Sequence, residues 1–270
     1  MSTKDKNDRR QFLASSALAL GGAAVLGATP VTAGVSKTKG EEMAYVLDLP
    51  EVVSVAIVGT DSRFPVRRVF CLGRNYAAHA VESGDDPTVN PPFFFMKPRD
   101  AVVEASEGFP YPSVTKALRY EAEMVVALKS GGTDIDPANA LNHVYGYGVG
   151  LDMTRQDLQE EAQRLSRPWA ISKSFDKSAP MGPLHPVETH GHAVDGKIWL
   201  TVNGEMKQNS NLSLQRWSVS EAISILSQHY ELSAGDLILT GTPEGIGLVE
   251  KGDVINVGID GLGEIEVNVL

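Results

Sequence analysis

Two glutamates one residue apart, Glu121 and Glu123, stand at the start of the apolar, β-branched run 124–128. Such a run predicts a β-strand, and side chains two apart on a strand point to the same face. Adjacent carboxylates repel each other, so both ionise readily only when a positive charge lies between them. Oxygen-only ligands favour a hard divalent ion, Mg²⁺ or Mn²⁺. The alternative is a solvent-facing polar edge of a half-buried strand.

A third carboxylate, Asp152, ends the glycine-rich run 146–151, which also predicts a strand. A helix is expected next, with Thr154 as its N-cap, Asp157 near the N3 position and apolar residues at helical spacing through 158–165. Taken alone, Asp152 would equally suit a capping or turn residue. Three carboxylates from two strands, however, form a metal site that leaves positions open for water and substrate.

His79 and Glu82 lie three residues apart in a segment bracketed by Gly73 and Gly84. Residues at this spacing are neighbours on one face of a helix. Glu82 would hold the imidazole in one tautomer and raise its basicity, which makes His79 a general base for water. The two glycines would act as hinges of a mobile segment. An ordinary surface pair is the alternative.

Two further residues suit an anionic ligand. Lys173 lies in the short apolar stretch 171–175, which predicts a strand. Its ammonium would complement an anionic substrate or a developing enolate, or else form a structural salt bridge with one of the carboxylates. Thr242 lies in the glycine-rich loop 240–247, after the predicted strand 236–239. Backbone N–H groups in such a loop bind carboxylates, and a plain turn is the alternative.

These motifs occur together in one known family. From about Arg67 to Leu270 the chain resembles the fumarylacetoacetate hydrolase superfamily, within it the acylpyruvase and fumarylpyruvate hydrolase branch. The markers are Gly73-Arg74-Asn75-Tyr76-Ala77-Ala78-His79-Ala80-Val81-Glu82, Phe95-Met96-Lys97-Pro98, Glu121-Ala122-Glu123, Leu151-Asp152-Met153-Thr154, Arg167-Pro168-Trp169, Lys173-Ser174-Phe175-Asp176 and Leu239-Thr240-Gly241-Thr242-Pro243. The resemblance implies a metal, Mg²⁺ or Mn²⁺, held by Glu121, Glu123 and Asp152. It also implies catalytic roles for His79, Glu82 and Lys173, with the first two on a mobile lid.

The resemblance assigns substrate contacts to Arg74, Tyr76, Gln156, Gln159 and Thr242. One of these departs from the family pattern, because relatives often carry an arginine four residues after the metal aspartate, where this chain has Gln156. The neighbouring Arg155 lies about 100° round a helix and is not expected to replace it. Loss of a bidentate cation leaves the identity of the substrate open and does not affect the metal ligands.

The strand and turn signals predict an α+β, mainly β domain. Asn203-Gly204 and Asp260-Gly261 each separate two strand-like runs, which predicts two hairpins. Ser218 and Glu221 form a capping-box pattern that opens a helix reaching about His229. The resemblance implies a mixed β-sandwich roll of the fumarylacetoacetate hydrolase C-terminal type, and a homodimer.

The predicted organisation has three parts: an export signal over 1–33, a short lead-in over 34–65 and a catalytic domain over 66–270. Arg9-Arg10 followed by Phe12-Leu13, an apolar stretch from Ala14 and a small-residue cleavage site ending at Ala33 indicate twin-arginine export to the periplasm. The alternative is a misassigned start with Met43 as the true beginning, which would place the protein in the cytoplasm.

The 270 residues carry a formal net charge of −10, which argues against nucleic acid or an anionic membrane as partner. A small anionic keto acid would need a local positive pocket, for which Arg74, Lys97, Arg155 and Lys173 are the candidates.

The single cysteine, Cys71, excludes an internal disulfide and a thiolate zinc cluster, and a buried, inert thiol is expected. His190 and His192 suggest a second metal site or, more simply, a solvated loop.

Three functions fit these expectations. The first is a metal-dependent hydrolase that cleaves a carbon–carbon bond of an acylpyruvate or fumarylpyruvate, releasing pyruvate and a carboxylic acid. The second keeps the metal site for oxaloacetate decarboxylation or for dicarboxylate isomerisation or tautomerisation. The third is a binding protein for metal and keto acid without turnover, against which the His79–Glu82 pair argues, because binding needs no general base.

Overall fold

The computed structural model describes residues 45–89 and 91–270. The export signal predicted for residues 1–33 lies outside this described part. The chain divides into two compact units, Met1–Leu49 and Pro50–Leu270. Of the first unit only residues 45–49 are described, and these are exposed and without regular structure. Every strand and helix below belongs to the second unit, which the remaining paragraphs concern.

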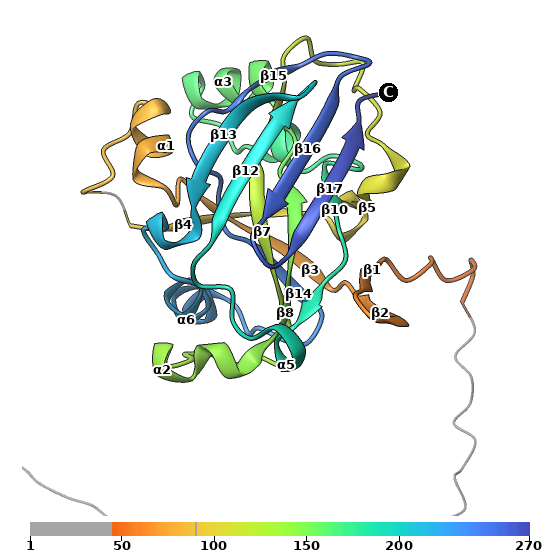
Figure 1. The fold of residues 1–270 in the computed structure, drawn as a ribbon, viewed down its shortest axis with the longest axis vertical. Coiled ribbons are helices and arrows are strands. Elements are labelled where there is room, and N and C mark those ends of the chain that lie inside the picture. Colours follow the sequence, from red (N-terminus) through yellow and green to blue (C-terminus); the bar gives the residue numbers. More distant parts are fainter. Residues whose placement is uncertain (1–44, 90) are drawn as a thin grey trace, which may run out of the picture. The chain divides into compact units, whose positions relative to one another are not determined.

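A large mixed sheet forms the centre of the fold (Figure 1). Its strands follow the order β4-β3-β14-β7-β8-β10-β5, and β11 pairs with β8 beside this path. The bounds are β3 (Arg68–Gly73), β4 (Phe93–Lys97), β5 (Val102–Glu104), β7 (Ala122–Leu128), β8 (Val144–Leu151), β10 (Ala179–Met181), β11 (His185–Pro186) and β14 (Asp236–Leu239). All seven residues of β7 are buried, because the sheet is covered on both faces at its centre.

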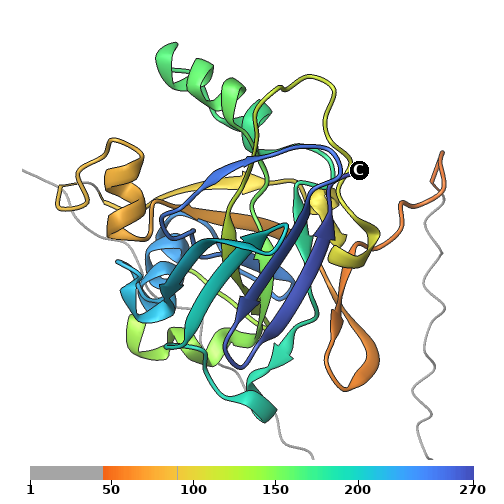
Figure 2. The ribbon, with the colours of Figure 1, turned by 45° about the horizontal axis from the view of Figure 1, so that its top comes forward.

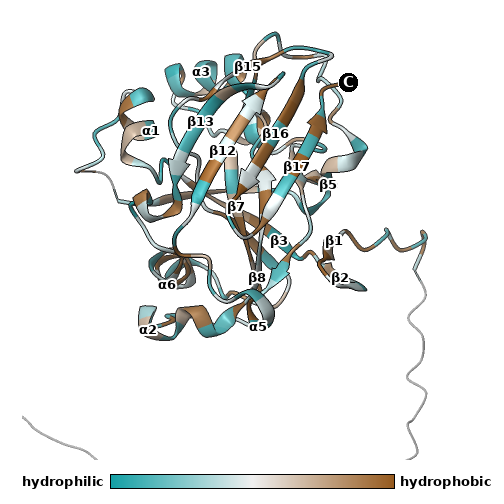
Figure 3. Ribbon diagram, in the orientation of Figure 1, coloured by the Kyte–Doolittle hydropathy of each residue, from teal (hydrophilic) through white to brown (hydrophobic). Residues whose placement is uncertain are grey.

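A second, antiparallel sheet lies over the first, in front of β7 and β8 in Figure 1. Its order is β13-β12-β16-β17, with bounds β12 (Lys197–Val202), β13 (Glu205–Asn211), β16 (Val254–Ile259) and β17 (Gly263–Asn268). Both predicted hairpins are confirmed here, since Asn203-Gly204 joins β12 to β13 and residues 260–262 join β16 to β17. Apolar and polar residues alternate along β12 and β17 (Figure 3). The apolar residues face the large sheet and complete the main core.

Two smaller sheets complete the strand inventory. The first has the order β15-β6-β9, with β6 (Leu118–Tyr120), β9 (Thr154–Arg155) and β15 (Gly247–Val249). The second is the hairpin of β1 (Ser54–Ile57) and β2 (Thr60–Pro65). Val55, Ile57 and Phe64 of this hairpin are buried in a second apolar cluster with Leu237 and Leu239 of β14. The hairpin thus packs against the large sheet.

The helices are short. They are α1 (Ala77–Glu82), α2 (Pro137–Ala140), α3 (Gln156–Arg164), α4 (Ala170–Lys173), α5 (Val187–His190) and α6 (Val219–His229), with 3₁₀ turns at Arg99–Ala101, Ala105–Glu107, Leu141–His143 and Leu212–Leu214. In Figures 1 and 2, α1 and α3 lie outside the layered sheets on the upper left. Within the described residues, none of the helices is long and apolar enough to cross a membrane.

The helix predictions had mixed outcomes. The capping box of Ser218 and Glu221 is confirmed at the start of α6. Thr154 as an N-cap was wrong: the N-cap of α3 is Arg155, and Thr154 belongs to β9. A strand at Lys173 was also wrong, because this residue ends the four-residue helix α4. Cys71 is fully buried in β3, as expected, and burial raises the pKa of its thiol.

Candidate active site

Antiparallel pairing of β7 and β8 brings the three predicted metal ligands together. Glu123 lies in β7, Glu121 directly precedes β7, and Asp152 directly follows β8. The pairing places Glu123 opposite Gly150, and the backbone N–H of Asp152 donates to the carbonyl oxygen of Glu121 at 2.9 Å. All three side chains are buried, and one oxygen from each lies within 4.8 Å of the others. The predicted carboxylate cluster therefore exists.

Cations surround two of these carboxylates. Lys173 Nζ donates to Glu121 Oε2 at 2.8 Å and to Asp152 Oδ2 at 2.7 Å. Lys97 Nζ forms an ion pair with Asp152 Oδ1 at 2.7 Å, and Arg119 Nε donates to Glu121 Oε1 at 3.0 Å. Burial alone would raise the pKa of Glu121, but Lys173 and Arg119 hold that pKa well below its usual range. Glu121 is thus held as an anion, and Asp152 has a lysine ammonium beside each of its two oxygens.

Glu123 differs from its two neighbours. Its Oε2 accepts a hydrogen bond from the backbone N–H of Gly241 at 2.8 Å, and among the described residues no cation forms an ion pair with it. Burial and the nearby charges of Asp152 and Glu121 raise the pKa of Glu123 well above its usual range. Full ionisation of all three carboxylates would therefore be favoured by one more positive charge beside Glu123. Three clustered carboxylate oxygens are the donor set that suits Mg²⁺ or Mn²⁺.

The predicted His79–Glu82 pair is present on α1. His79 is buried, and its Nδ1 lies 3.1 Å from Glu82 Oε2. The other oxygen of Glu82 accepts a hydrogen bond from the backbone N–H of Gly245 at 3.1 Å, so the carboxylate is held on both sides. With Nδ1–H donated to Glu82, the lone pair of His79 lies on Nε2. This is the arrangement of a general base.

The pair and the carboxylates face one pocket of about 260 Å³. The predicted residues that line it are Arg74, His79, Glu82, Glu121, Glu123, Gln156, Gln159, Lys173 and Thr242. Asp152 lies beneath its floor, with no exposed surface. Tyr76 does not line the pocket and lies buried at the N-terminus of α1. Nine of the eleven predicted side chains thus share one cavity.

The predicted substrate contacts are held by neighbours within that pocket. Arg74 adopts a left-handed backbone conformation with φ of 54°, and its guanidinium pairs with Asp85 at 2.6 Å. On α3, Gln156 Nε2 donates to Glu160 Oε1 at 2.7 Å. Gln159 Oε1 accepts a hydrogen bond from Arg119 Nη2 at 2.8 Å. The N–H₂ group of Gln159 is therefore the part of this side chain that can donate to a ligand. Two uncharged amides of α3 therefore line this side of the pocket.

Two of the four cations proposed for a positive pocket lie elsewhere. Arg155 was a wrong candidate: as N-cap of α3 its side chain turns toward α4, donates to the carbonyl of Ile171 at 3.1 Å and lies 4.0 Å above the ring of Phe175. Lys97 is buried below the pocket, where it also donates to Ser178 Oγ at 2.9 Å. Arg74 and Lys173 are the two candidates that line the pocket.

Sequence reasoning missed two residues. Arg119 lies two positions before Glu121, and this spacing along a strand was a usable signal for a shared face. Gln208 of β13 is fully buried and had no signal, because it stands in a polar strand. Its Oε1 accepts from the backbone N–H of Ala122 at 3.0 Å, and its Nε2 donates to Thr242 Oγ1 at 2.9 Å and to the carbonyl of Pro243 at 2.8 Å. Gln208 thus joins the metal-ligand strand to the Thr242 loop.

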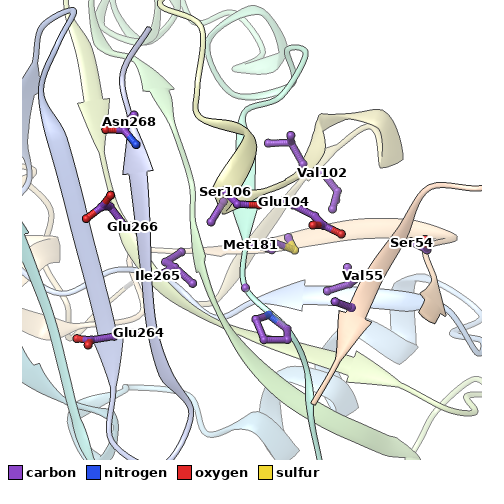
Figure 4. A pocket seen from close by; sticks show the side chains of 15 residues that line it. Ser54, Val55, Val102, Glu104, Ser106, Met181, Glu264, Ile265, Glu266 and Asn268 are labelled. Carbon is purple, nitrogen blue, oxygen red and sulfur yellow. The ribbon is translucent and has the colours of Figure 1, made fainter. Parts of the chain in front are cut away.

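A larger cavity of about 440 Å³ lies elsewhere, between β1, β5, β10 and β17 (Figure 4). Its wall includes Glu104, Glu264 and Glu266, of which Glu104 pairs with Arg63 at 2.6 Å. None of the predicted site residues lines it. The carboxylate cluster, the histidine and the lysine all belong to the smaller pocket, and that pocket is the candidate active site.

Comparison with known proteins identifies the family. Residues 68–270 match the family model described as Fumarylacetoacetate (FAA) hydrolase C-terminal. The chain belongs to the fumarylacetoacetate hydrolase family. The resemblance inferred from the motifs and the mixed, mainly β fold are both confirmed. The chain is therefore an enzyme of this family.

Similar members of the family differ in their activities. The solved structure of fumarylpyruvate hydrolase from Pseudomonas aeruginosa, in complex with Mn²⁺ and pyruvate, is 51% identical with a TM-score of 0.82, over 84% of this chain and 99% of that one. Fumarylpyruvate hydrolase of a Ralstonia species is 40% identical over 185 residues, 68% of this chain and 95% of the relative. Mitochondrial oxaloacetate tautomerase FAHD1 of Mus musculus is 40% identical over 200 residues, 73% of this chain and 88% of the relative.

Proposed function

We propose that this enzyme is a divalent-metal-dependent hydrolase that cleaves a carbon–carbon bond of an acylpyruvate, with fumarylpyruvate as the leading substrate. The observation that carries the proposal is the meeting of two groups at one 260 Å³ pocket: the oriented His79–Glu82 pair, and a buried carboxylate cluster of which Glu121 and Glu123 line the pocket and Asp152 lies beside them. The Pseudomonas aeruginosa relative, solved with Mn²⁺ and pyruvate, supports both the metal and the product.

Glu121, Glu123 and Asp152 would hold the metal, Mg²⁺ or Mn²⁺. When bound, such an ion supplies Lewis-acid polarisation of substrate oxygens and orients the substrate. The carboxyl of Glu123, which forms no ion pair among the described residues, and the oxygen-only donor set support this assignment. Thr242 Oγ1 accepts a hydrogen bond from Gln208, so its own proton is available to the pocket and suits a substrate carboxylate.

His79 would begin the chemistry by taking a proton from water at Nε2. Glu82 would stabilise the imidazolium that forms, through the hydrogen bond it shares with Nδ1. The resulting hydroxide attacks the distal carbonyl carbon, and the carbon–carbon bond breaks with its electron pair leaving on the pyruvate enolate. Lys173 lies beside the carboxylates with its charge buried, where it would stabilise that enolate. Protonation of the enolate then gives pyruvate and the carboxylic acid.

Oxaloacetate tautomerisation or decarboxylation is the second candidate. Gln156 favours it, because the arginine that often binds the keto-acid carboxylate in relatives is absent from that position. The Mus musculus tautomerase supports it as well. Both reactions require an enolate-stabilising pocket, and tautomerisation requires a base, but neither requires an attacking water. The same residues would therefore serve for tautomerisation, with His79 removing a proton from a carbon atom of the substrate instead of from water.

A side-by-side assay separates these candidates. Fumarylpyruvate, acetylpyruvate and oxaloacetate are each incubated with the enzyme and Mg²⁺ or Mn²⁺, with chelator controls, and products are followed by NMR. Pyruvate plus a carboxylic acid from an acylpyruvate supports the hydrolase. Activity on oxaloacetate alone supports the second candidate. Tight retention of a keto acid without any product would instead favour a binding protein.

Export to the periplasm and assembly as a homodimer also belong to this proposal. The motif around Arg9-Arg10 supports export, and family membership supports the dimer. Cell fractionation with a twin-arginine to twin-lysine variant tests export. Light scattering of the purified enzyme tests the dimer.

A further inference from the structure

Two histidines far from the active-site pocket face each other across a short distance. His185 belongs to β11, whose pairing with β8 sets it opposite Tyr147, and His190 is the last residue of α5. His185 Nδ1 lies 3.2 Å from His190 Nε2, and the two rings are nearly perpendicular, with centroids 4.6 Å apart. His185 is half-buried and His190 is exposed. Solutes can therefore reach the pair.

The hydrogen bonds around His190 determine which of its nitrogens carries the proton. Thr189 Oγ1 donates its single proton to the carbonyl of Pro186 at 3.1 Å. The same oxygen lies 2.8 Å from His190 Nδ1, so it must accept a hydrogen bond from Nδ1–H. In the neutral ring the proton is thereby placed on Nδ1. The lone pair of Nε2 then faces His185.

The surroundings of His185 lead to the same result. Its Nε2 faces the turn at Leu262 and Gly263, where the backbone carbonyl of Leu262 is a hydrogen-bond acceptor for the ring. With the proton on Nε2, the lone pair of Nδ1 faces His190. Burial and the neighbouring His190 lower the pKa of His185, which favours the neutral ring at pH 7. The lone pair of His190 Nε2 thus faces His185 Nδ1 across 3.2 Å, where either a proton carried by Nδ1 or a metal ion can join the two nitrogens.

The separation of the two nitrogens suits a metal ion. Imidazole nitrogens bind Zn²⁺ at about 2.0–2.1 Å, so two of them on a tetrahedral ion lie about 3.3–3.4 Å apart. Metal-ligating histidines also usually donate their second N–H to a carbonyl or another oxygen, as both rings do here. We propose that His185 Nδ1 and His190 Nε2 form a surface chelate for a divalent transition ion of the imidazole-binding class: Cu²⁺, Ni²⁺ or Zn²⁺.

The ion would differ from that of the active site. Imidazole pairs suit copper, nickel and zinc, whereas carboxylate oxygens suit magnesium and manganese, so the two sites would prefer different ions. Among the described residues the carboxylate cluster is the only group of three or more ligating side chains, so water would complete the coordination at the histidines. His192, next to this pair in sequence, bonds to the Tyr147 hydroxyl through Nδ1 at 2.9 Å and forms no group of three ligands with the pair. The proposal is independent of the reaction assigned to the active site.

The test measures Cu²⁺ binding in a Glu123→Gln background, which removes competition from the carboxylate cluster. Calorimetry is expected to show one bound ion at the pair, and electron paramagnetic resonance should show coupling to two nitrogens. His185→Ala and His190→Ala should each weaken binding about tenfold or more and abolish the two-nitrogen signal, since a chelate becomes a single ligand. Thr189→Val should weaken Cu²⁺ binding about tenfold, because the hydroxyl that holds the proton of His190 on Nδ1 is lost. Thr189→Ser keeps a hydroxyl and should bind Cu²⁺ like the parent protein.

The matched control is His229→Ala, which removes an exposed histidine at the end of α6 and should leave binding unchanged. Equal Cu²⁺ affinity in the wild-type pair and in His190→Ala would overturn the proposal. So would a pair that binds no ion and instead shares one proton, seen by NMR as a single protonation event common to both rings. Either result would be obtained whether or not the enzyme hydrolyses acylpyruvates.

Discussion

The ammonium of Lys173 bridges Glu121 and Asp152, at 2.8 Å and 2.7 Å, and so ties together two carboxylates from different strands. Removing a partner from a buried ion pair leaves uncompensated charge and costs about 3–5 kcal/mol. We expect Lys173→Met to lower the unfolding free energy of the metal-free enzyme by about this amount. Saturating Mn²⁺ should recover part of the loss, because the ion restores positive charge. Thermal denaturation with and without Mn²⁺ measures both effects.

The control for this variant is Lys177→Met, four residues along the chain. Lys177 is about half exposed and lies 3.8 Å from Glu107, so its ion pair contributes about 0–1 kcal/mol. Equal stability of the two variants would contradict a structural role for the Lys173 bridge.

Glu123→Gln should abolish binding of Mn²⁺ without destabilising the metal-free fold. The substitution keeps the shape of the side chain and its acceptor oxygen for Gly241, and it replaces a buried carboxyl, whose ionisation is opposed by burial and by nearby anions, with a neutral amide. At pH 7 the metal-free variant is therefore expected to unfold at a temperature equal to or above that of the metal-free wild type. Calorimetric titration with Mn²⁺ and thermal denaturation test the two parts. A variant that binds Mn²⁺ like the wild type would remove Glu123 from the ligand set.

His79→Ala should leave Mn²⁺ bound while lowering kcat about 10²–10⁴-fold, the usual contribution of a general base. The reason is that His79 faces the pocket but forms no bond to the three carboxylates. Glu82→Gln should reduce kcat less, because the amide still accepts a hydrogen bond from the imidazole without stabilising its charge. His229→Ala, on α6, is the matched control. Full turnover by His79→Ala would show that the base lies elsewhere.

Gln208 and Thr242 should behave as one unit in substrate binding. Thr242→Val removes the hydroxyl proton offered to the substrate carboxylate, and we expect KM to rise about tenfold. Gln208→Met releases Thr242 and should also raise KM. If Gln208 acts through Thr242, the double variant will have a KM close to that of Thr242→Val alone. Additive effects in this double-mutant cycle would contradict the coupling, whereas Thr242→Ser should stay near wild type.

Asp157 provides a test of pH dependence away from the metal. Burial is the largest single effect and raises its pKa, but hydrogen bonds from the backbone N–H of Lys116 and the Thr115 hydroxyl together bring the pKa below its usual value. Its stabilising effect is therefore complete above the unfolded-state pKa of about 3.9 and lost as the pH falls through the lower folded value. Asp157→Asn should cost about 1 kcal/mol at pH 7, and the difference should vanish once the pH is below the folded-state pKa of Asp157. Urea unfolding at several pH values measures it.

The metal centre could be predicted because its geometry follows from local rules. Alternation along a strand places Glu121 and Glu123 on one face, and the end of a glycine-rich strand places Asp152 beside them. The i,i+3 spacing of His79 and Glu82 is equally local. The hairpins and the α6 capping box followed from turn and cap residues for the same reason.

Other features depend on contacts that sequence spacing does not contain. Gln208 is 86 residues from Ala122 and 34 from Thr242, so no local pattern links them. Thr154 does not cap α3, because its hydroxyl donates to Glu121 Oε1 at 3.0 Å and so supports a metal ligand instead. Lys173 ends a helix of four residues, which is too short to show a helical period. Arg155 turns toward Phe175, where its guanidinium gains a stacking partner.

The backbone of Gly245 supports Glu82, and Thr242 stands three residues earlier in the same loop. In the proposed reaction, one short stretch of chain would thus bind the acid end of the substrate and also hold the residue that orients the proton acceptor. A molecule without that acid group would leave the loop unengaged and the imidazole less firmly held. The enzyme would then distinguish one keto acid from another by kcat as much as by binding affinity.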